Sequence, residues 1–306
     1  MTHPLPQTEY TCLQAILDAL FAAAPRNKAM IEEHYRGKTA ADFDFIEGVA
    51  EQLLRIIGGR LQGYVEDYAW TCRLMLQCEM QYRRAAAYEN TRFEDVVSGL
   101  YSSAEDMRRY MRGLMLSQVL WRQHIGPLQV FAQDFLPSVK DAASYLEIGP
   151  GHGLWLARAG AALEKARLSA WDISPHSLTE TQEALGVLGL ERSVDMAARD
   201  ICSSMPDGAQ FDIVVMSQVI ETVSDPAQTM RNIASLLTPG GKVFLNIPVR
   251  AAAPDHIRRW ADEDAPLALV KDAGLSVRKT WLFGARGEDI GSQDGFSLVV
   301  VAVREA

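Results

Sequence analysis

The sequence of 306 residues predicts a two-part fold, in which an all-helical N-terminal part precedes an open α/β sheet of mostly parallel strands. Three observations support this prediction. Before Pro137, apolar residues recur at the spacing of a helix face. After Pro137, short apolar runs alternate with helical patterns. The segment 138–143 is short and polar, so we predict a helical domain over residues 1–137 and an α/β domain over residues 138–306.

The helical part is predicted to consist of several helices, one of which is strongly amphipathic. Gly58 and Gly59 interrupt the apolar pattern and favour a break between two helices. In the segment 103–120, large apolar residues recur at i, i+3 and i+4, which is typical of a helix with one buried face. The predicted helices cover residues 8–24, 27–36, 39–57, 62–88, 91–99, 103–120 and 124–135.

The α/β part is predicted to contain several short strands separated by helices. Helical patterns lie among the first five strands, and this alternation indicates parallel strands joined by crossover helices. The last two strands have no helix between them and are expected to form an antiparallel pair at the edge of the sheet. The predicted strands cover residues 144–149, 168–173, 194–199, 211–217, 243–248, 275–283 and 296–303. The predicted helices cover residues 153–164, 175–189, 225–237 and 255–273.

Three of these helices have recognisable starts. Ser174 and Asp225 each precede a proline, which places a capping side chain directly before a proline in the first turn. Asp255, which follows Pro254, is expected to cap the helix predicted over 255–273.

Composition and charge disfavour several classes of protein. The formal net charge is −9 and the pI is about 5.2, whereas a nucleic-acid-binding protein normally carries a basic stripe. The four cysteines form neither a C-x-x-C pair nor a metal-ligand pattern. The N-terminus has no signal-peptide pattern, and the apolar stretch 12–24 is too short to span a membrane. We therefore expect a cytoplasmic protein that uses no metal, nucleic acid or membrane.

A glycine-rich loop follows the first predicted strand. The run from Glu147 to Gly153 reads Glu-Ile-Gly-Pro-Gly-His-Gly. Glycine lets the backbone turn sharply and approach a ligand closely. In nicotinamide-binding proteins, the third glycine of such a loop comes three residues after the second, and Leu154 occupies that position here. This spacing disfavours a nicotinamide-dependent oxidoreductase.

Polar residues end the next three predicted strands. Asp172 follows Gly153 by 19 residues, close to the offset expected of a carboxylate that binds ribose hydroxyls. A carboxylate suits this role because it can accept both hydrogen bonds of a vicinal diol. Asp200 ends the third strand, and Ser217 and Gln218 end the fourth.

These motifs, in this order, resemble those of class I S-adenosylmethionine-dependent methyltransferases, as does the turn Leu237-Thr-Pro-Gly-Gly241. The resemblance covers about residues 144–303. It implies a Rossmann-like fold, S-adenosylmethionine as cofactor, S-adenosylhomocysteine as product and a small-molecule methyl acceptor. It also implies a set of cofactor contacts: Glu147, Gly149, Gly151 and Gly153 around the methionine moiety, Asp172 at the ribose, Ile173, Asp200 and Ile201 at the adenine, and Ser217 and Gln218 on the methyl side.

One position departs from the family pattern. Many small-molecule relatives have a Glu-His pair where this chain has Glu221 and Thr222. No role of that histidine can therefore be transferred to Thr222.

A catalytic base is not obligatory for this chemistry. Methyl transfer from a sulfonium is an in-line displacement with a neutral leaving group, so holding the nucleophile in line supplies much of the acceleration. A base is needed only where the acceptor atom holds a proton of high pKa. His256 and His124 are the candidate bases, whereas His152 is expected to pack or to face solvent and Glu221 to lie at the surface or at a helix end.

The helical part is expected to supply the acceptor site. The residues proposed to bind the acceptor are Tyr110, Met111, Met115, Gln118 and Trp121. The alternative is that this stripe is ordinary core, and methionine suits both roles. A catalytically silent, cofactor-binding regulatory protein is the alternative to an enzyme. The sequence leaves open the acceptor, the atom that is methylated (O, N or C), the use of a base and the formation of a homodimer.

Overall fold

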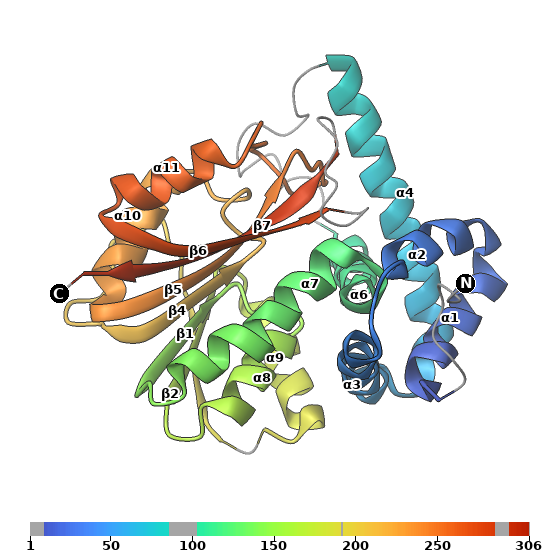
Figure 1. Ribbon diagram of the computed structural model, residues 1–306, viewed down its shortest axis with the longest axis horizontal. Helices are drawn as coiled ribbons and strands as arrows, with labels where there is room; N and C mark the ends of the chain where they lie inside the picture. Colours follow the sequence, from blue (N-terminus) through green and yellow to red (C-terminus); the bar gives the residue numbers. More distant parts are fainter. Residues whose placement is uncertain (1–8, 86–102, 191, 285–293, 306) are drawn as a thin grey trace.

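The computed structural model describes residues 9–85, 103–190, 192–284 and 294–305. Figure 1 shows a twisted sheet with helices on both of its faces and a group of N-terminal helices beside it. The helix predicted over 91–99 lies outside the described residues, as do the last residues of the helix predicted over 62–88.

Within the described residues, the strands form one sheet in the order β3-β2-β1-β4-β5-β7-β6. Strands β1 to β5 are parallel to one another, whereas β7 is antiparallel to both β5 and β6. The predicted Rossmann-like sheet with an antiparallel edge pair is thus confirmed. The strands are β1 (Ser144–Ile148), β2 (Arg167–Asp172), β3 (Val194–Ala198), β4 (Phe211–Ser217), β5 (Leu237–Val249), β6 (Leu275–Gly284) and β7 (Phe296–Arg304).

Two of the three predicted helix caps of the α/β part are present. The side chain of Ser174 accepts a hydrogen bond from Ser177 N–H, and that of Asp225 accepts one from Gln228 N–H. Each is followed by a proline in the first turn, as predicted. The helices of this part are α8 (Leu154–Ala162), α9 (Pro175–Leu188), α10 (Pro226–Leu236) and α11 (Asp264–Asp272).

The cap predicted at Asp255 is wrong, because α11 begins only at Asp264. The segment before α11 is not helical, and backbone hydrogen bonds fix it in place. Ile257 N–H donates to the carbonyl of Glu221, and Arg250 N–H donates to the carbonyl of Trp260. Residues 250–263 therefore form a loop that folds back over the carboxyl edge of the sheet.

The predicted helices of the N-terminal part are present where the structure describes them. Thr39 and Asp42 form a capping box at the start of α3. The predicted break at Gly58 is a single 3-10 turn, in which Gly58 has a φ angle of 59°. The elements are α1 (Thr11–Ala23), η1 (Pro25–Asn27), α2 (Lys28–Tyr35), α3 (Ala40–Ile57), η2 (Gly58–Arg60), α4 (Leu61–Ala85), α6 (Ala104–Leu120), α7 (Arg122–Val130), η4 (Phe131–Phe135) and η5 (Leu136–Val139).

The helical part and the sheet share one hydrophobic core. Helix α7 lies against β6 and β7, where Gly126 faces the ring of Phe283. Phe131 of η4 packs against Trp155 of α8 and Phe244 of β5, with ring centroids 4.9 and 5.3 Å apart. Apolar residues on both sides of the predicted domain boundary belong to this core, and the boundary itself stays a prediction.

This packing places α6 opposite the loops at the carboxyl edge of the sheet. Helix α6 directly precedes α7 and packs against α4 and α3. The terminal methyl group of Met111 in α6 lies close to Gly151, in the loop that follows β1. The fold thus brings a helix of the N-terminal part to the place where ligands bind in open α/β sheets.

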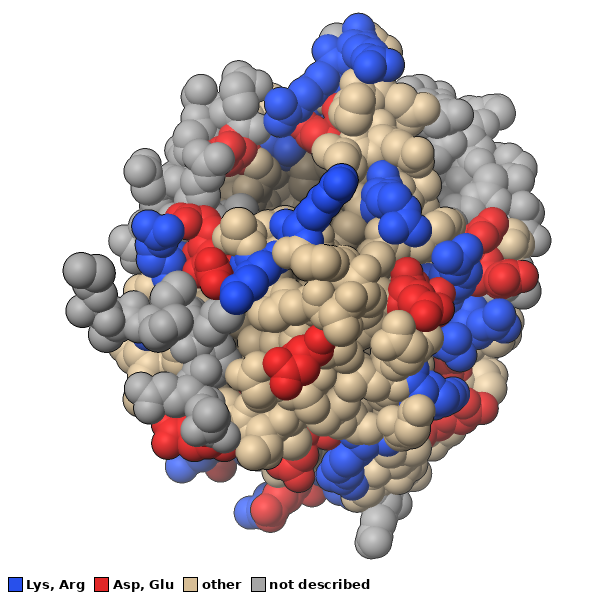
Figure 2. Space-filling view, turned by 90° about the vertical axis from the view of Figure 1, so that its right-hand side faces the viewer, with Lys and Arg blue, Asp and Glu red and all other residues tan. Residues whose placement is uncertain are grey.

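The outer face of the helical part carries a mixed set of charges. On the face that Figure 2 shows, basic and acidic side chains lie in small, interspersed groups separated by uncharged surface. One such pair on α4 joins Arg83 Nε to Glu79 Oε1 at 2.8 Å. None of the helices in the described ranges is both long and apolar enough to cross a membrane.

The substitution Gly126→Ala tests the close contact between α7 and the sheet. A Cβ atom at this position would lie 2.3 Å from the ring of Phe283. We expect the substitution to lower the free energy of unfolding by about 1–3 kcal/mol, because the core must shift to admit the methyl group.

Gly186→Ala in α9 is the matched control, since no atom lies within 4 Å of its added Cβ. Alanine is expected to stabilise this helix by up to about 1 kcal/mol. Denaturant unfolding measures both variants, and equal effects of the two would contradict the packing described for α7.

Candidate active site

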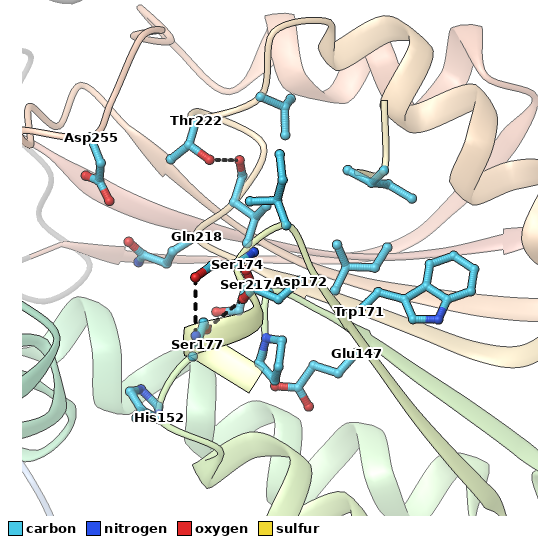
Figure 3. Close-up of a pocket in the computed structure, with 18 of the residues that line it drawn as sticks. Glu147, His152, Trp171, Asp172, Ser174, Ser177, Ser217, Gln218, Thr222 and Asp255 are labelled. Atoms are coloured by element: carbon cyan, nitrogen blue, oxygen red, sulfur yellow. Dashed lines mark hydrogen bonds between the residues drawn. The ribbon is translucent and has the colours of Figure 1, made fainter. Parts of the chain in front are cut away.

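A cavity of about 480 Å³ lies between the carboxyl ends of β1, β2 and β4 and one face of α6. Its volume is typical of small-molecule sites. Figure 3 shows side chains of the strand ends and of the segments that follow them around the cavity, with Trp171 at one end and Asp255 and Gln218 at the other. The cavity lining includes many residues that the sequence predicted: Glu147, Gly149, Gly151, Asp172, Ile173, Asp200, Ile201, Ser217, Gln218, Met111, Gln118 and His124.

The loop after β1 depends on backbone conformations that favour glycine. Gly149, Gly151 and Gly153 have φ angles of 69°, 50° and 74°. A Cβ at Gly149 would also lie 2.5 Å from a methyl carbon of Val219. Gly149 and Gly151 line the cavity, whereas Gly153 does not and instead precedes α8 as its N-cap. At Gly149 and Gly151 the backbone therefore borders the cavity with no side chain in between.

Asp172 ends β2 with its carboxylate at the cavity (Figure 3). Its Oδ1 accepts a hydrogen bond from Ser174 N–H at 2.8 Å, and its Oδ2 accepts one from Ser177 Oγ at 2.8 Å. Burial raises the pKa of this carboxyl, and the two hydrogen bonds oppose that shift. The start of α9 thus fixes the carboxylate, which keeps further lone pairs for a ligand.

The wall next to Asp172 combines apolar surface with hydrogen-bond acceptors. Ile173 lines the cavity and is 47% exposed, which is unusual for a large apolar side chain. Asp200 follows β3 and accepts hydrogen bonds from Cys202 N–H at 2.8 Å and Ser203 Oγ at 3.2 Å. Ile201 beside it is buried. This wall suits a flat ligand group that has a polar edge.

Glu147 lies in β1 and is only 3% exposed. Its Oε2 accepts a hydrogen bond from the Tyr145 hydroxyl at 2.7 Å. Burial raises its pKa to about 8, although this hydrogen bond acts in the opposite direction. The carboxyl is therefore mostly protonated at neutral pH while the cavity holds no cation.

Gln218, which follows β4, has a strained backbone with a φ angle of 56°. Positive φ is uncommon for residues other than glycine and occurs preferentially at functional sites. Gln218 N–H donates to the carbonyl of Asn246 at 2.8 Å, and Asn246 Nδ2 donates to Ser217 Oγ at 3.0 Å. Asn246 of β5 also lines the cavity. Asn246 was not among the predicted site residues, because one asparagine inside an apolar run forms no motif.

One face of α6 forms the wall opposite the sheet. Of the residues proposed to bind the acceptor, Met111 and Gln118 line the cavity, whereas Tyr110, Met115 and Trp121 do not. Met115 is buried in the hydrophobic core, and Trp121 Nε1 donates a hydrogen bond to Tyr68 at 2.7 Å. The spacing i, i+4, i+7 and i+11 identifies the face that lines the cavity: Met107, Met111, Leu114 and Gln118.

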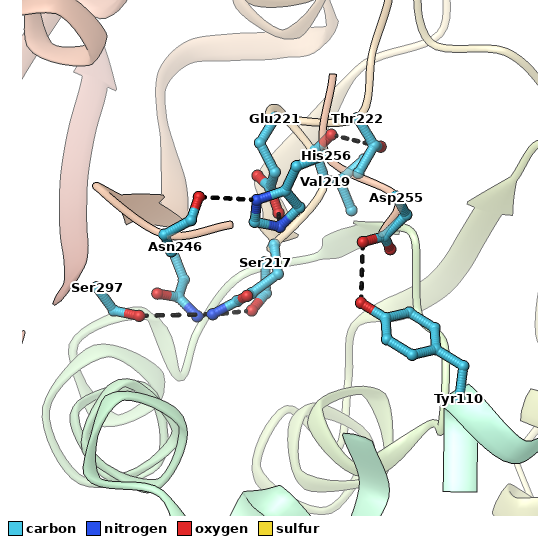
Figure 4. A network of polar contacts seen from close by, with 11 residues as sticks. Tyr110, Ser217, Val219, Glu221, Thr222, Asn246, Asp255, His256 and Ser297 are labelled. Carbon is cyan, nitrogen blue, oxygen red and sulfur yellow. Dashed lines mark hydrogen bonds and ion pairs between the residues drawn. The ribbon is translucent and has the colours of Figure 1, made fainter. Parts of the chain in front are cut away.

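Tyr110 reaches the site through Asp255. Its hydroxyl donates a hydrogen bond to Asp255 Oδ1 at 2.9 Å, and Asp255 lines the cavity (Figure 4). Asp255 was predicted as a helix cap and not as a residue of the cavity. Its position shortly after β5, at the ligand-binding edge of the sheet, was the available signal.

The two candidate bases occupy different places. His124 lines the cavity, with its Nδ1 2.7 Å from Ser117 Oγ. Burial lowers the pKa of His124 to about 3, so its imidazole is neutral at physiological pH. His256 is buried and does not line the cavity. His152, which was expected to pack or to face solvent, lines the cavity, and burial lowers its pKa to about 4.

Glu221, expected to lie at the surface, is only 1% exposed. Its Oε1 lies 3.7 Å from Nε2 of His256 (Figure 4). Burial raises the pKa of Glu221 well above its usual range and lowers that of His256, so burial favours the uncharged form of each side chain. This pair joins the loops after β4 and β5, which carry Thr222 and Asp255 at the cavity.

Comparison with known proteins identifies the α/β part. Residues 146–243 match the family model described as "Methyltransferase domain". The curated relatives include a ubiquinone biosynthesis O-methyltransferase of Parvibaculum lavamentivorans, 33% identical over 104 residues, and one of Aeromonas salmonicida, 40% identical over 73 residues. These matches cover 33% and 21% of this chain, and 38% and 30% of the two relatives. The chain therefore matches well under half the length of these curated relatives.

Two solved structures share the fold. The mitomycin 7-O-methyltransferase MmcR has a TM-score of 0.53 at 17% identity, over 88% of this chain and 76% of that one. The N-methyltransferase NodS of Bradyrhizobium japonicum, solved with S-adenosyl-L-homocysteine, has a TM-score of 0.50 at 14% identity, over 71% of this chain and all of that one (100%). The family match, the sheet order and the glycine loop coincide on the same residues. Residues 146–243 of this chain are therefore similar to a methyltransferase domain, and the α/β part has the fold of these two methyltransferases.

Proposed function

We propose that this protein transfers a methyl group from S-adenosylmethionine to a small-molecule acceptor. One observation carries the proposal: the glycine loop, the carboxylate of Asp172 and the methionine-bearing face of α6 surround a single cavity. A methyl donor held by the sheet would thus meet an acceptor held by α6.

The residues of the sheet fit the chemistry of an adenosyl sulfonium. The backbone of Gly149 and Gly151 can approach the methionine moiety because no side chain intervenes. Asp172 offers a fixed carboxylate to the ribose diol, and Ile173 offers an apolar surface to the adenine. Asp200 and Ile201 would bind the adenine by its edge and face. Glu147, Ser217 and Gln218 would border the methionine and methyl side.

The donor, when bound, supplies a methyl carbon attached to a positively charged sulfur. As the bond between acceptor and methyl carbon forms, the bond between sulfur and carbon breaks, and a hydroxyl acceptor releases its proton. Met107, Met111 and Leu114 exclude water from this side of the cavity. Because positioning supplies much of the acceleration, the walls of the cavity matter more than a strong base.

His124 is the better placed of the two candidate bases. We propose that its neutral imidazole contacts the acceptor group and helps to hold it in line with the methyl donor, because a ring with a pKa of about 3 is a weak base. We propose for His256 a positioning role, since it contacts the loop after β4 through Glu221 and lies outside the cavity lining. A cytoplasmic location and a homodimer stay predictions that rest on composition alone.

Asp172→Ala tests the proposed ribose contact. Loss of the carboxylate is expected to weaken the binding of S-adenosylmethionine by about 1–3 kcal/mol, which is roughly fivefold to 150-fold in affinity. Isothermal titration calorimetry measures this change.

Ser177→Ala is the matched control. It removes one internal hydrogen bond of Asp172 and keeps the carboxylate, so it should change the affinity far less. Equal losses in the two folded variants would mean that Asp172 only anchors α9 and does not bind the ribose.

The raised pKa of Glu147 predicts a proton linked to cofactor binding. A cationic ligand beside Glu147 favours the carboxylate, so binding at pH 7 should release about one proton. Lowering the pH keeps Glu147 protonated and opposes binding, and the affinity should therefore rise with pH up to about 8.

Calorimetry in buffers of different ionisation enthalpy measures the proton that is released. Glu147→Gln carries no ionisable group and should abolish both the release and the rise in affinity. A wild-type affinity that is constant between pH 6 and pH 8 would exclude this role of Glu147.

A further inference from the structure

The end of the cavity next to α6, where the methyl acceptor would bind, combines apolar and polar groups. We call it the acceptor end. Its wall on α6 is apolar, formed by Met107, Met111 and Leu114. Polar groups lie on or next to this wall. They include Gln118, His124 and Asp255.

The amide of Gln118 presents its oxygen without a partner. Its Nε2 lies 3.4 Å from the carbonyl oxygen of Leu114, which can only accept, so the orientation of the amide is set. Gln118 is 7% exposed, and its Oε1 is buried with no hydrogen-bond partner among the described residues. A buried polar atom of this kind is unfavourable unless a ligand satisfies it.

The imidazole of His124 also lines this end of the cavity. Ser117 Oγ donates to the carbonyl of Leu114 at 2.6 Å and lies 2.7 Å from Nδ1 of His124. Gln118 Nε2, which can only donate, lies 3.3 Å from the same Nδ1, so the roles of the two ring nitrogens depend on the tautomer. In the described part of the chain, no group is hydrogen-bonded to Nε2.

Asp255 adds a negative charge at this end. Its Oδ1 accepts the hydrogen bond from Tyr110, and none of the described residues donates one to its Oδ2. Arg199 is the sole lysine or arginine among the described lining residues. Its guanidinium stacks on Trp171, 5.0 Å from the ring centroid, at the opposite end of the cavity. An anion at the acceptor end would thus meet a carboxylate without a compensating cation.

We propose that the methyl acceptor is an uncharged, mostly apolar molecule with at least two hydroxyl groups, and that this site rejects carboxylates and phosphates. The inference rests on the proposed function, whose acceptor it specifies. One hydroxyl donates to Oε1 of Gln118 and a second donates to Asp255, and one of the two is methylated. In the transfer, the new C–O bond forms as the S–C bond breaks, and the hydroxyl proton is released to solvent.

Binding of matched aromatic probes to the protein saturated with S-adenosylhomocysteine tests the proposal. The probes are benzene-1,2-diol, phenol and 3,4-dihydroxybenzoate. We expect the diol to bind about tenfold more tightly than phenol, because a second buried acceptor is satisfied. We expect the dihydroxybenzoate to bind at least about tenfold more weakly than the diol, because its carboxylate is repelled.

Two nearly isosteric variants assign these preferences to residues. Asp255→Asn should bring the affinity for the dihydroxybenzoate close to that for the diol. Gln118→Met should reduce the advantage of the diol over phenol. Retained affinity for S-adenosylhomocysteine and an unchanged melting temperature show that each variant is folded.

Three outcomes would overturn the inference: the dihydroxybenzoate binds as tightly as the diol, the discrimination persists unchanged in Asp255→Asn, or no probe binds to protein that does bind S-adenosylhomocysteine. Failure of the proposed function looks different. In that case the folded protein binds neither S-adenosylhomocysteine nor any probe.

Discussion

The packing of α7 and η4 against the sheet is the constraint on which the site depends. Gly126 allows the helix to approach the ring of Phe283, and Phe131 fits between Trp155 and Phe244. Interiors packed at this density do not deform continuously, so the position of α7 is well defined. Because α6 leads directly into α7, its position relative to the glycine loop follows from the same contact. The wall that α6 contributes to the cavity is thus held by the core that the helical part shares with the sheet.

Strand ends and polar anchors complete the site on the other side. Parallel strands bring their carboxyl ends to one edge, so residues far apart in the sequence meet there. Asp172 and Asp200 are each held by the backbone and hydroxyl groups that follow them in the chain, which fixes both carboxylates before a ligand arrives. On the sheet side the cavity is polar and preorganised, whereas α6 covers it with adaptable methionines.

Much of the fold and of the cofactor side could be predicted from the sequence, because local signals encode both. Glycine spacing, capped helix starts and acidic residues at strand ends are features of short segments, and they identified Asp172 and the loop at Gly149. The acceptor side depends on tertiary contacts that no local pattern specifies. The stripe on α6 contains residues of two faces, and only packing shows that Met111 faces the cavity while Met115 faces the core.

The contacts of the loop after β5 could not be predicted from local sequence patterns either. The pair Pro254-Asp255 predicts a helix start, yet the contact between Tyr110 and Asp255 spans 145 positions of the chain. Glu221 is predicted at the surface or at a helix end, because the sequence does not show the nearby imidazole of His256, and buried carboxylates are rare.

The central claim is that the sheet and α6 enclose one cofactor and acceptor cavity, and hydrogen–deuterium exchange with S-adenosylhomocysteine tests it most directly. The account predicts that the ligand slows exchange in two separate regions: the loop around Gly149 with the start of α9, and the cavity-facing segment of α6 from Met107 to Gln118. Protection confined to residues outside both regions, or no protection at saturating ligand, would contradict it.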